Sequence, residues 1–386
     1  MLSTTSNARE ISRESESKEG ADYGVLVTSI GSAGASIISA LKMASKMPEQ
    51  ILAFRLFQAP SLLFKNLPQT IAADAVKVLR SAGVECEVQH KDETFTPGDA
   101  DHEVALVIRD VNQMSALLES VMLLLGAPVA QAKQVLCTTP AVLVGKVSAS
   151  TVEALRRRFA PFGVEVDASN TPRAKFDAFL ADGVTATVRA QAIELAQTNG
   201  IEVCLGKGGG TEPIFATNLN REDAEKLHSL MARSKYPVII VNRDFQRFDV
   251  RLEKATPSSE LTAMLVETAG MPERVVPKVM TRLPVVTHSN VRYSEMQQII
   301  GRLGALGAVA SAQLISFQSF SLAIEKVGDL PTSTMILRGI GGLSQENAET
   351  ALTRTRRADG PFSSTLARWL QVELKHAGTV SKVVSR

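Results

Sequence analysis

The chain has 386 residues, and its 42 basic and 40 acidic side chains leave a formal net charge of only +2. A charge so close to zero excludes strong whole-chain attraction to nucleic acid or anionic lipid. Aromatic residues make up 5%, so the chain is not built around platforms that stack bases or sugars. Hydrophobic residues make up 45%, which is enough to form cores, and at about 150 residues per domain the length suggests two or three domains.

The first 20 residues are polar, include four glutamates and contain no apolar core. This composition predicts a disordered polar tail and argues against a secretory signal. No run of 18 apolar residues follows, so we expect no insertion into a membrane. The three cysteines form no CxxC pair and indicate a reducing compartment. We therefore expect a cytoplasmic protein.

After this tail, one pattern recurs along the chain. A helical run, a glycine and an alternating strand occur together at Gly83, Gly163, Gly307 and Gly378. A degenerate copy has Tyr236 at the glycine place, and the successive intervals are 80, 73, 71 and 71 residues. Recurrence of the same pattern at intervals of 71 to 80 residues indicates a repeat architecture.

Two further marks accompany this one. An alternating strand opens each copy, at 23–30, 103–110, 175–182, 247–254 and 319–326. A turn between two helices lies between the marks, and it contains Pro48, Pro128 or Pro272, with Ser344 in the last copy. Proline suits the first turn of a helix, where its missing N–H is not needed, so a second helix is predicted to begin there.

The three marks divide the chain into five modules, which replace the two or three domains suggested by length. Residues 1–20 form the tail, and a polar linker at 90–101 between the first two modules is expected to flex. The predicted modules are module 1 (21–92), module 2 (101–169), module 3 (173–242, degenerate), module 4 (246–316) and module 5 (318–386).

Each module has the same predicted order: strand, two helices, a short apolar strand or extended loop, a third helix and a closing strand. The third helix begins at a polar cap such as Ser148 or Asn220 and ends at a glycine. The closing strand is expected to lie beside the opening one. The predicted fold class is therefore α+β: a tandem array of about five small βααβ(α)β-type modules, each a small sheet with helices on one face.

This order resembles the C-terminal domain of the bacterial ribosomal stalk protein, whose fold is similar to that of the Clp protease adaptor. The stretches that carry the resemblance are 43–89, 123–168 and 337–384, and together the copies cover most of residues 21–386. The motifs are short and apolar. The resemblance therefore implies the fold of each module before it implies any activity.

In the stalk family, basic residues on the first long helix bind translation factors. The matching positions are Ser39 and Lys42 in module 1, Glu119 and Met122 in module 2, Ala263 and Val266 in module 4, and Met335 and Arg338 in module 5. The basic character is not kept, so the resemblance implies the scaffold and not factor binding. We take Lys42, Glu119, Met122, Val266 and Arg338 as candidate partner-binding residues. Because Ala263, Val266, Met335 and Leu123–Leu125 are apolar, this surface is expected to be buried between modules or against a partner.

Signals for catalysis are weak. The five histidines (His90, His102, His228, His288 and His376) have no metal-ligand spacing, and Cys86, Cys137 and Cys204 are expected to be buried, inert thiols. We expect no metal and no cofactor. The one glycine-rich loop, 205–213, is interpreted as a flexible replacement loop in module 3. A second interpretation is a small-anion site that uses Lys207, Gly208, Gly209 and Gly210.

Two runs of arginine are candidates for nucleic-acid contact. They are Arg156, Arg157 and Arg158, for which a solvated helix face is the favoured interpretation, and Arg354, Arg356 and Arg357. Neither run is interleaved with aromatic residues.

The function predicted from sequence is a non-enzymatic, multi-module scaffold for protein–protein interaction, or a structural component of a larger cytoplasmic assembly, with protein partners or self-assembly. A ribosome- or nucleic-acid-associated factor is the alternative, and an enzyme or small-anion binder at 205–213 is the third hypothesis.

Overall fold

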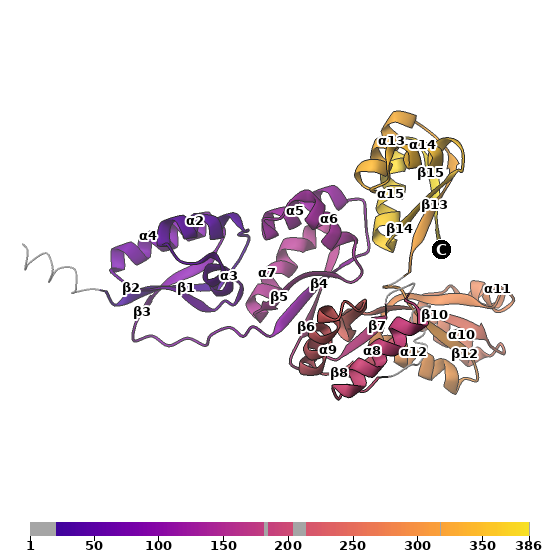
Figure 1. The fold of residues 1–386 in the computed structure, drawn as a ribbon, viewed down its shortest axis with the longest axis horizontal. Helices are drawn as coiled ribbons and strands as arrows, with labels where there is room; N and C mark the ends of the chain where they lie inside the picture. Colours follow the sequence, from indigo (N-terminus) through magenta and orange to yellow (C-terminus); the bar gives the residue numbers. More distant parts are fainter. Residues whose placement is uncertain (1–20, 181–183, 204–213, 317, 386) are drawn as a thin grey trace, which may run out of the picture. The chain divides into compact units, whose positions relative to one another are not determined.

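The computed structural model describes residues 21–180, 184–203, 214–316 and 318–385 (Figure 1). These residues form five three-stranded sheets, and each sheet takes its strands from one stretch of the chain. In every sheet the opening strand is central, with the middle strand on one side and the closing strand on the other. The predicted α+β array of small modules is therefore confirmed, and the minor strand left open by the sequence is a full member of each sheet.

Module 1 shows how the pattern of the sequence becomes a core. Val25 and Val27 alternate along the central strand and are fully buried against Ile37, Leu52 and Val76, which come from the three helices. Because side chains alternate in a strand and recur every three to four residues in a helix, one face of each element is apolar. The elements are β1 (Tyr23–Ser29), α2 (Ser36–Ser45), α3 (Glu49–Phe57), β2 (Ser61–Leu67), α4 (Gln69–Ser81) and β3 (Glu85–His90).

Module 2 repeats this order. The predicted cap of its third helix is confirmed, because the Ser148 hydroxyl accepts a hydrogen bond from the Thr151 N–H at 3.3 Å. The elements are β4 (His102–Ile108), α5 (Met114–Leu125), α6 (Val129–Cys137), β5 (Ala141–Val147), α7 (Ala149–Phe159), the short 3-10 helix η1 (Ala160–Phe162) and β6 (Val164–Asn170).

Module 3 has one described helix between its first two strands. Its third helix begins at Asn220, whose side chain accepts a hydrogen bond from the Asp223 N–H at 2.8 Å, as predicted. The described elements are β7 (Phe176–Leu180), α8 (Ala186–Thr198), β8 (Ile214–Leu219), α9 (Arg221–Arg233) and β9 (Val238–Asn242).

Modules 4 and 5 return to the full order. The elements of module 4 follow the 3-10 helix η2 (Arg243–Phe245) and are β10 (Arg247–Lys254), α10 (Ser259–Ala269), η3 (Glu273–Val275), α11 (Val276–Met280), β11 (Val285–Arg292), α12 (Tyr293–Ala305) and β12 (Val309–Leu314). Those of module 5 are β13 (Phe320–Lys326), α13 (Leu330–Gly339), α14 (Gln345–Thr353), β14 (Arg357–Phe362), α15 (Ser364–His376) and β15 (Val380–Ser385).

A β-bulge recurs in the middle strand. Asn66, Asn218 and Asn290 have φ between 55° and 59° and lie where the register with the central strand shifts. Lys146 has φ 60° at the corresponding place in module 2. Asparagine tolerates the left-handed conformation better than most residues, which suits it to this bulge. Modules 1, 2 and 4 also share a cis peptide bond just before this strand, at Pro60, Pro140 and Pro284.

Three details differ from the sequence predictions. In module 3 the residue at the glycine place is Lys235, with φ 57°, and not Tyr236. The Tyr236 N–H donates to the Met231 carbonyl, five residues earlier, as the N–H of Val84, the residue after Gly83, donates to the Leu79 carbonyl in module 1. Pro48 and Pro272 lie at the N-cap and not in the first turn, because their extended ψ precedes the helix. The linker at 90–101 is held to module 1, since the Gly98 N–H donates to the Pro60 carbonyl at 2.8 Å.

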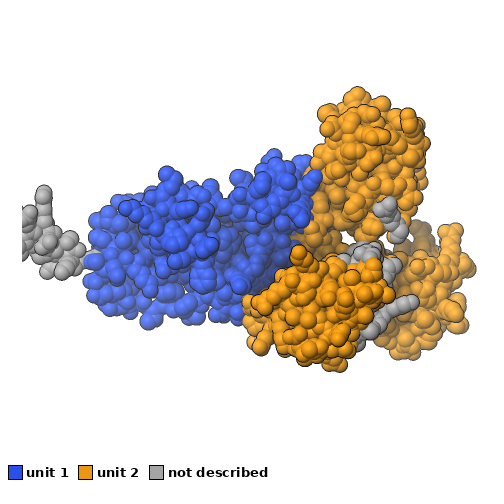
Figure 2. Space-filling view, in the orientation of Figure 1, with its two compact units in different colours: residues 1–136, 142–168 blue, residues 137–141, 169–386 orange. Residues whose placement is uncertain are grey.

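The chain divides into two compact units, coloured blue and orange in Figure 2. Unit 1 contains the described residues up to Leu136 together with Val142–Ala168, and therefore modules 1 and 2 except for a short segment. Unit 2 contains Cys137–Ala141 and the described residues from Ser169 onward, with modules 3 to 5.

Candidate functional site

The candidate partner-binding residues occupy one repeated position on the first helix of four modules. Lys42, Met122, Val266 and Arg338 each lie four residues before a residue with positive φ near the helix end, namely Lys46, Gly126, Gly270 and Gly342. One turn earlier are Ser39, Glu119, Ala263 and Met335. Because i and i+3 lie on the same side of a helix, each module presents a pair of side chains near the same turn.

The chemistry at this position differs from module to module. Lys42 is exposed and pairs with Glu49 at 3.1 Å across the turn, whereas Glu119 is exposed and Met122 is half-buried. Val266 is 38% exposed, and Arg338 is exposed. This position is therefore cationic in modules 1 and 5, apolar in module 4, and both acidic and apolar in module 2. Such variety does not favour one common ligand.

The apolar members of this surface differ in their burial within the described chain, and their burial against a partner stays a prediction. Leu123 is 67% exposed and Met335 is 61% exposed, while Leu124 is in the core of module 2 and only 1% exposed. The helix period explains the split, because adjacent residues point about 100° apart and only one of them can face the sheet.

In module 4 this surface is one wall of a groove of about 700 Å³. Pro257, Ala263 and Val266 supply its apolar part, and Glu267 and Glu273 supply acidic groups. At its start the Ser258 hydroxyl caps α10 by accepting a hydrogen bond from the Leu261 N–H at 3.1 Å. The groove therefore combines an apolar wall with negative charge, which suits an apolar side chain flanked by basic residues.

Sequence reasoning found Val266 but missed the acidic groups beside it. Glu267 follows Val266 directly and is ion-paired to Arg302 at 2.8 Å, while Glu273 begins the next short helix. The Pro272–Glu273 turn was the available signal for Glu273, because it places a carboxylate near a helix start. Glu267 lies near the end of α10, where the sequence offers no such signal.

Arg158 serves the junction between modules 1 and 2 in unit 1. Its guanidinium donates from Nη1 to the carbonyls of Ser32 and Ala33 at 3.1 and 3.0 Å, and from Nε to the Ser120 hydroxyl at 3.2 Å. Burial lowers the pKa of this guanidinium. The favoured sequence interpretation, a solvated face, is therefore wrong for Arg158, whose side chain joins two modules.

The same junction uses hydroxyl groups at the start of α7. Thr151 donates to the Phe57 carbonyl at 2.8 Å, and Ser150 donates to the Thr28 carbonyl at 2.6 Å. Ala154, on the same helix, belongs to the core cluster of module 1, and the Ala35 N–H donates to the Leu123 carbonyl at 3.0 Å. The third helix of module 2 thus completes one end of module 1.

The other arginines of the two runs are exposed. Arg156 pairs with Glu153, and Arg157 pairs with Glu85 at 2.9 Å. In module 5, Arg354, Arg356 and Arg357 are all exposed around the turn before β14, and Arg357 pairs with Asp359 at 2.8 Å.

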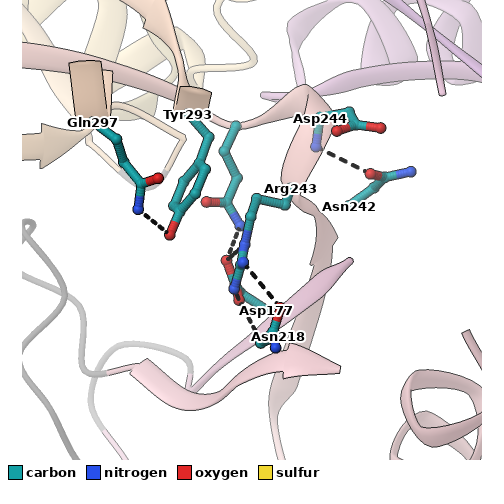
Figure 3. A network of polar contacts seen from close by, with 8 residues as sticks. Asp177, Asn218, Asn242, Arg243, Asp244, Tyr293 and Gln297 are labelled. Atoms are coloured by element: carbon teal, nitrogen blue, oxygen red, sulfur yellow. Dashed lines mark hydrogen bonds and ion pairs between the residues drawn. The ribbon is translucent and has the colours of Figure 1, made fainter. Parts of the chain in front are cut away.

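Modules 3 and 4 in unit 2 are joined by a buried polar network (Figure 3). The Asp177 carboxylate, with a side chain 4% exposed, forms an ion pair with Arg243 and accepts hydrogen bonds from the Asn218 N–H and the Gln246 amide, both at 2.9 Å. Burial alone would lower the pKa of the Arg243 guanidinium, but the hydrogen bond and charge of Asp177 raise it, so Arg243 stays charged.

Arg243 also reaches module 4. Its guanidinium carbon lies 4.6 Å from the centre of the Tyr293 ring, a cation–π contact, and the Tyr293 hydroxyl accepts a hydrogen bond from Gln297 at 2.8 Å (Figure 3). Beside it, Phe179 and Val241 of module 3 belong to the core cluster of module 4. The connection between these modules is therefore a packed, charged and hydrogen-bonded junction.

Some of the remaining candidate residues lie outside the described residues, and others lie inside the modules. Lys207, Gly208, Gly209, Gly210 and Cys204 are in the undescribed segment 204–213. His288 is 5% exposed and contacts the hydroxyls of Thr268 and Thr287 at 2.8 and 3.0 Å, and burial lowers its pKa. Burial also raises the pKa of the Cys86 thiol. Over the described ranges, we find no group of three or more metal-ligating side chains.

Membrane-spanning potential is confined to one bent pair of helices. Within the part of the chain that the structure describes, no single helix has both the length and the apolar character to cross a bilayer, while α5 and α6 pass that test only together, with a bend of 114° between them.

Comparison with known proteins adds no relative: no protein-family model, curated protein or solved structure matches this chain.

Proposed function

We propose that this protein is a non-enzymatic scaffold of a larger cytoplasmic assembly, in which the first-helix surfaces of the modules bind different protein partners. The observation that carries the proposal is the repeated position of Lys42, Met122, Val266 and Arg338, which keeps its place near the helix end while its chemistry changes. Several weak sites on one chain gain affinity because binding at one site raises the effective concentration at the next.

The module 4 groove gives this proposal a specific ligand. Its apolar wall at Ala263 and Val266 and its carboxylates at Glu267 and Glu273 suit a partner segment with one apolar side chain between basic residues. Burying the apolar side chain supplies affinity, and the carboxylates favour the correct orientation and raise the association rate.

The test begins with the full chain expressed in its native cell, with quantitative mass spectrometry of co-purified proteins. Val266→Glu places a charge in the groove, and we expect it to remove one subset of partners. Val309→Glu is the matched control, because Val309 is 55% exposed on β12 and is not among the groove residues. One lost partner is then purified, and its affinity for the full chain is measured.

With that purified partner, Val266→Glu is expected to weaken binding by about tenfold or more, which corresponds to about 1.4 kcal/mol. Reversing the charges with Glu267→Lys and Glu273→Lys should weaken it further in low salt. If every partner is retained by Val266→Glu and by the matching first-helix variants Met122→Glu and Arg338→Glu, the proposal is wrong.

Exposure of Arg354, Arg356 and Arg357 around one turn supports a second candidate function, contact with nucleic acid. Phosphate contacts weaken steeply as salt rises. Loss of partners on nuclease treatment and at raised salt, together with loss in a triple Arg→Gln variant, would favour this function over the scaffold.

A further inference from the structure

The junction inside unit 1 shows how one module binds another. The third helix of module 2 places Thr151 and Arg158 against backbone carbonyls of module 1, and the carbonyl of Leu123 on its first helix accepts the Ala35 N–H. Thr151 is completely buried and Ala154 is only 2% exposed as a result. One surface of a module, made by its first and third helices, is therefore a docking surface in this chain.

Module 1 carries the same surface without an occupant in the described chain. The repeat interval between modules 1 and 2 is 80 residues, so Leu123, Thr151 and Arg158 correspond to Met43, Ile71 and Val78. These three side chains are 86%, 53% and 64% exposed. The helices that bear them, α2 and α4, pack on the same core through Leu41 and Val76 and lie along one side of module 1 in Figure 1.

The module 1 surface is more apolar than its counterpart in module 2. The groups that donate hydrogen bonds from Thr151 and Arg158 are replaced by the aliphatic side chains of Ile71 and Val78. Ile71 and Val78 cannot donate hydrogen bonds to the carbonyls at the end of another module, which would become costly unpaired acceptors on docking. The surface therefore suits an apolar partner surface and not a module end.

The surface is also self-complementary in charge. Between Ile71 and Val78, the same helix exposes one acid and one base, Asp74 and Lys77, which pair with each other at 3.1 Å. When two copies meet about a two-fold axis, each side presents the same residues, so an apolar centre with one charge of each sign can match itself. A surface with a single sign of charge would repel its own copy.

We propose that two copies of this chain associate face to face through the module 1 surface formed by Met43, Ile71 and Val78. This deepens the proposed function by naming a second copy as one partner. It uses a surface apart from the module 4 groove, so either proposal can fail without the other. Burial of these side chains against their copies removes exposed apolar area from water, which supplies the driving force.

Sedimentation equilibrium of the full-length chain over a range of concentrations tests the proposal. The wild-type chain is expected to show a monomer–dimer equilibrium. Val78→Arg should raise the dimer dissociation constant by at least about tenfold, because each copy then brings an unpaired guanidinium group into the apolar surface. Val309→Arg, at a side chain of similar exposure in module 4, should leave the dissociation constant unchanged.

Three results would overturn the proposal. The first is a wild-type chain that remains monomeric at all concentrations. The second is a Val78→Arg variant that associates more strongly and into larger species, because this change restores the arginine that module 2 uses to bind a module end. The third is a wild-type monomer that dimerises only after removal of residues 1–20, which would make the chain's own tail the occupant. Circular dichroism of each variant, unchanged from wild type, excludes misfolding as the cause.

Discussion

Modules 1 and 2 meet through side chains that donate hydrogen bonds to backbone carbonyls, whereas modules 3 and 4 meet through a buried ion pair and a shared apolar core. In the first junction the donors, Thr151 and Arg158, lie on a helix of the second module. In the second junction Arg243 and Gln246 lie in the connecting segment itself. The same kind of module is thus joined by different groups in different places.

The length of the connection explains this difference. A linker of eleven residues separates β3 from β4 and leaves the relative placement of modules 1 and 2 open, so contacts between their helices and loops must define it. Only four residues separate β9 from β10, so their own side chains reach both modules. Between these two junctions, the joining groups lie in the linker where it is short and in the folded modules where it is long.

The largest expected effect is on the ion pair of the second junction. Asp177→Ala leaves the Arg243 guanidinium buried without its carboxylate, which we expect to lower the free energy of unfolding of modules 3 and 4 by about 3–5 kcal/mol. Urea denaturation with amide hydrogen exchange of β7 and β10 measures this change. Asp249, at the matching place in β10, accepts a hydrogen bond from the Asn290 N–H and forms no ion pair with an arginine of the described residues. Asp249→Ala is therefore the matched control, with a cost of about 1–3 kcal/mol. Equal losses in the two variants would contradict the role given to Arg243.

Removing the donors of the first junction should cost less. Arg158→Met keeps the length of the side chain but leaves the Ser32 and Ala33 carbonyls without their donor, at a cost of about 1–3 kcal/mol. The amide of Ala35, bonded to the Leu123 carbonyl, reports opening of this junction through its exchange rate. Faster exchange at Ala35 with unchanged exchange in β7 is the expected pattern. Arg156 pairs with Glu153 within α7 itself, so Arg156→Met is the control and should change neither rate.

A steric change tests the first junction independently of charge. A methyl group on Gly34 would lie 2.3 Å from the Leu123 carbonyl oxygen, so Gly34→Ala forces modules 1 and 2 apart at a cost of about 1–3 kcal/mol. The measurement is again the exchange rate of the Ala35 amide. Gly301, in the interior of α12 with open space around it, provides the opposite control, because Gly301→Ala should stabilise module 4 by about 0.5–1 kcal/mol. Unchanged protection of Ala35 in Gly34→Ala would show that these modules are not held together there.

The repeat made the fold predictable, while the junctions could not be predicted. Alternation at Val25 and Val27 and the caps at Ser148 and Asn220 are local signals, so strands, helices and the α+β array followed from them. Arg158 belongs to a run of three arginines, and only the arrangement of two modules decides which of the three is buried. The position of Glu267 beside the groove depends likewise on packing between elements. Local pattern specifies the module, and tertiary contact specifies the use of its surface.

The smallest expected effect is the pH dependence of the stability of module 4, through His288. An unfolded histidine titrates near 6.5, and burial lowers the pKa of His288 in the folded chain, where its nitrogens contact only the hydroxyls of Thr268 and Thr287 among the contacts described. Between those two values the unfolded state binds a proton that the folded state does not. The contribution of His288 to the free energy of unfolding of module 4 is therefore largest above pH 6.5. It decreases as the pH falls below 6.5, by at most about 1.4 kcal/mol per pH unit. Hydrogen exchange in β10 and β11 at pH 7.5 and 5.5, corrected for the intrinsic rate, should show this loss, and His288→Gln, which keeps hydrogen-bonding groups but does not titrate, should reduce it. If the wild-type protein and His288→Gln lose stability equally between pH 7.5 and 5.5, another group is responsible for the loss.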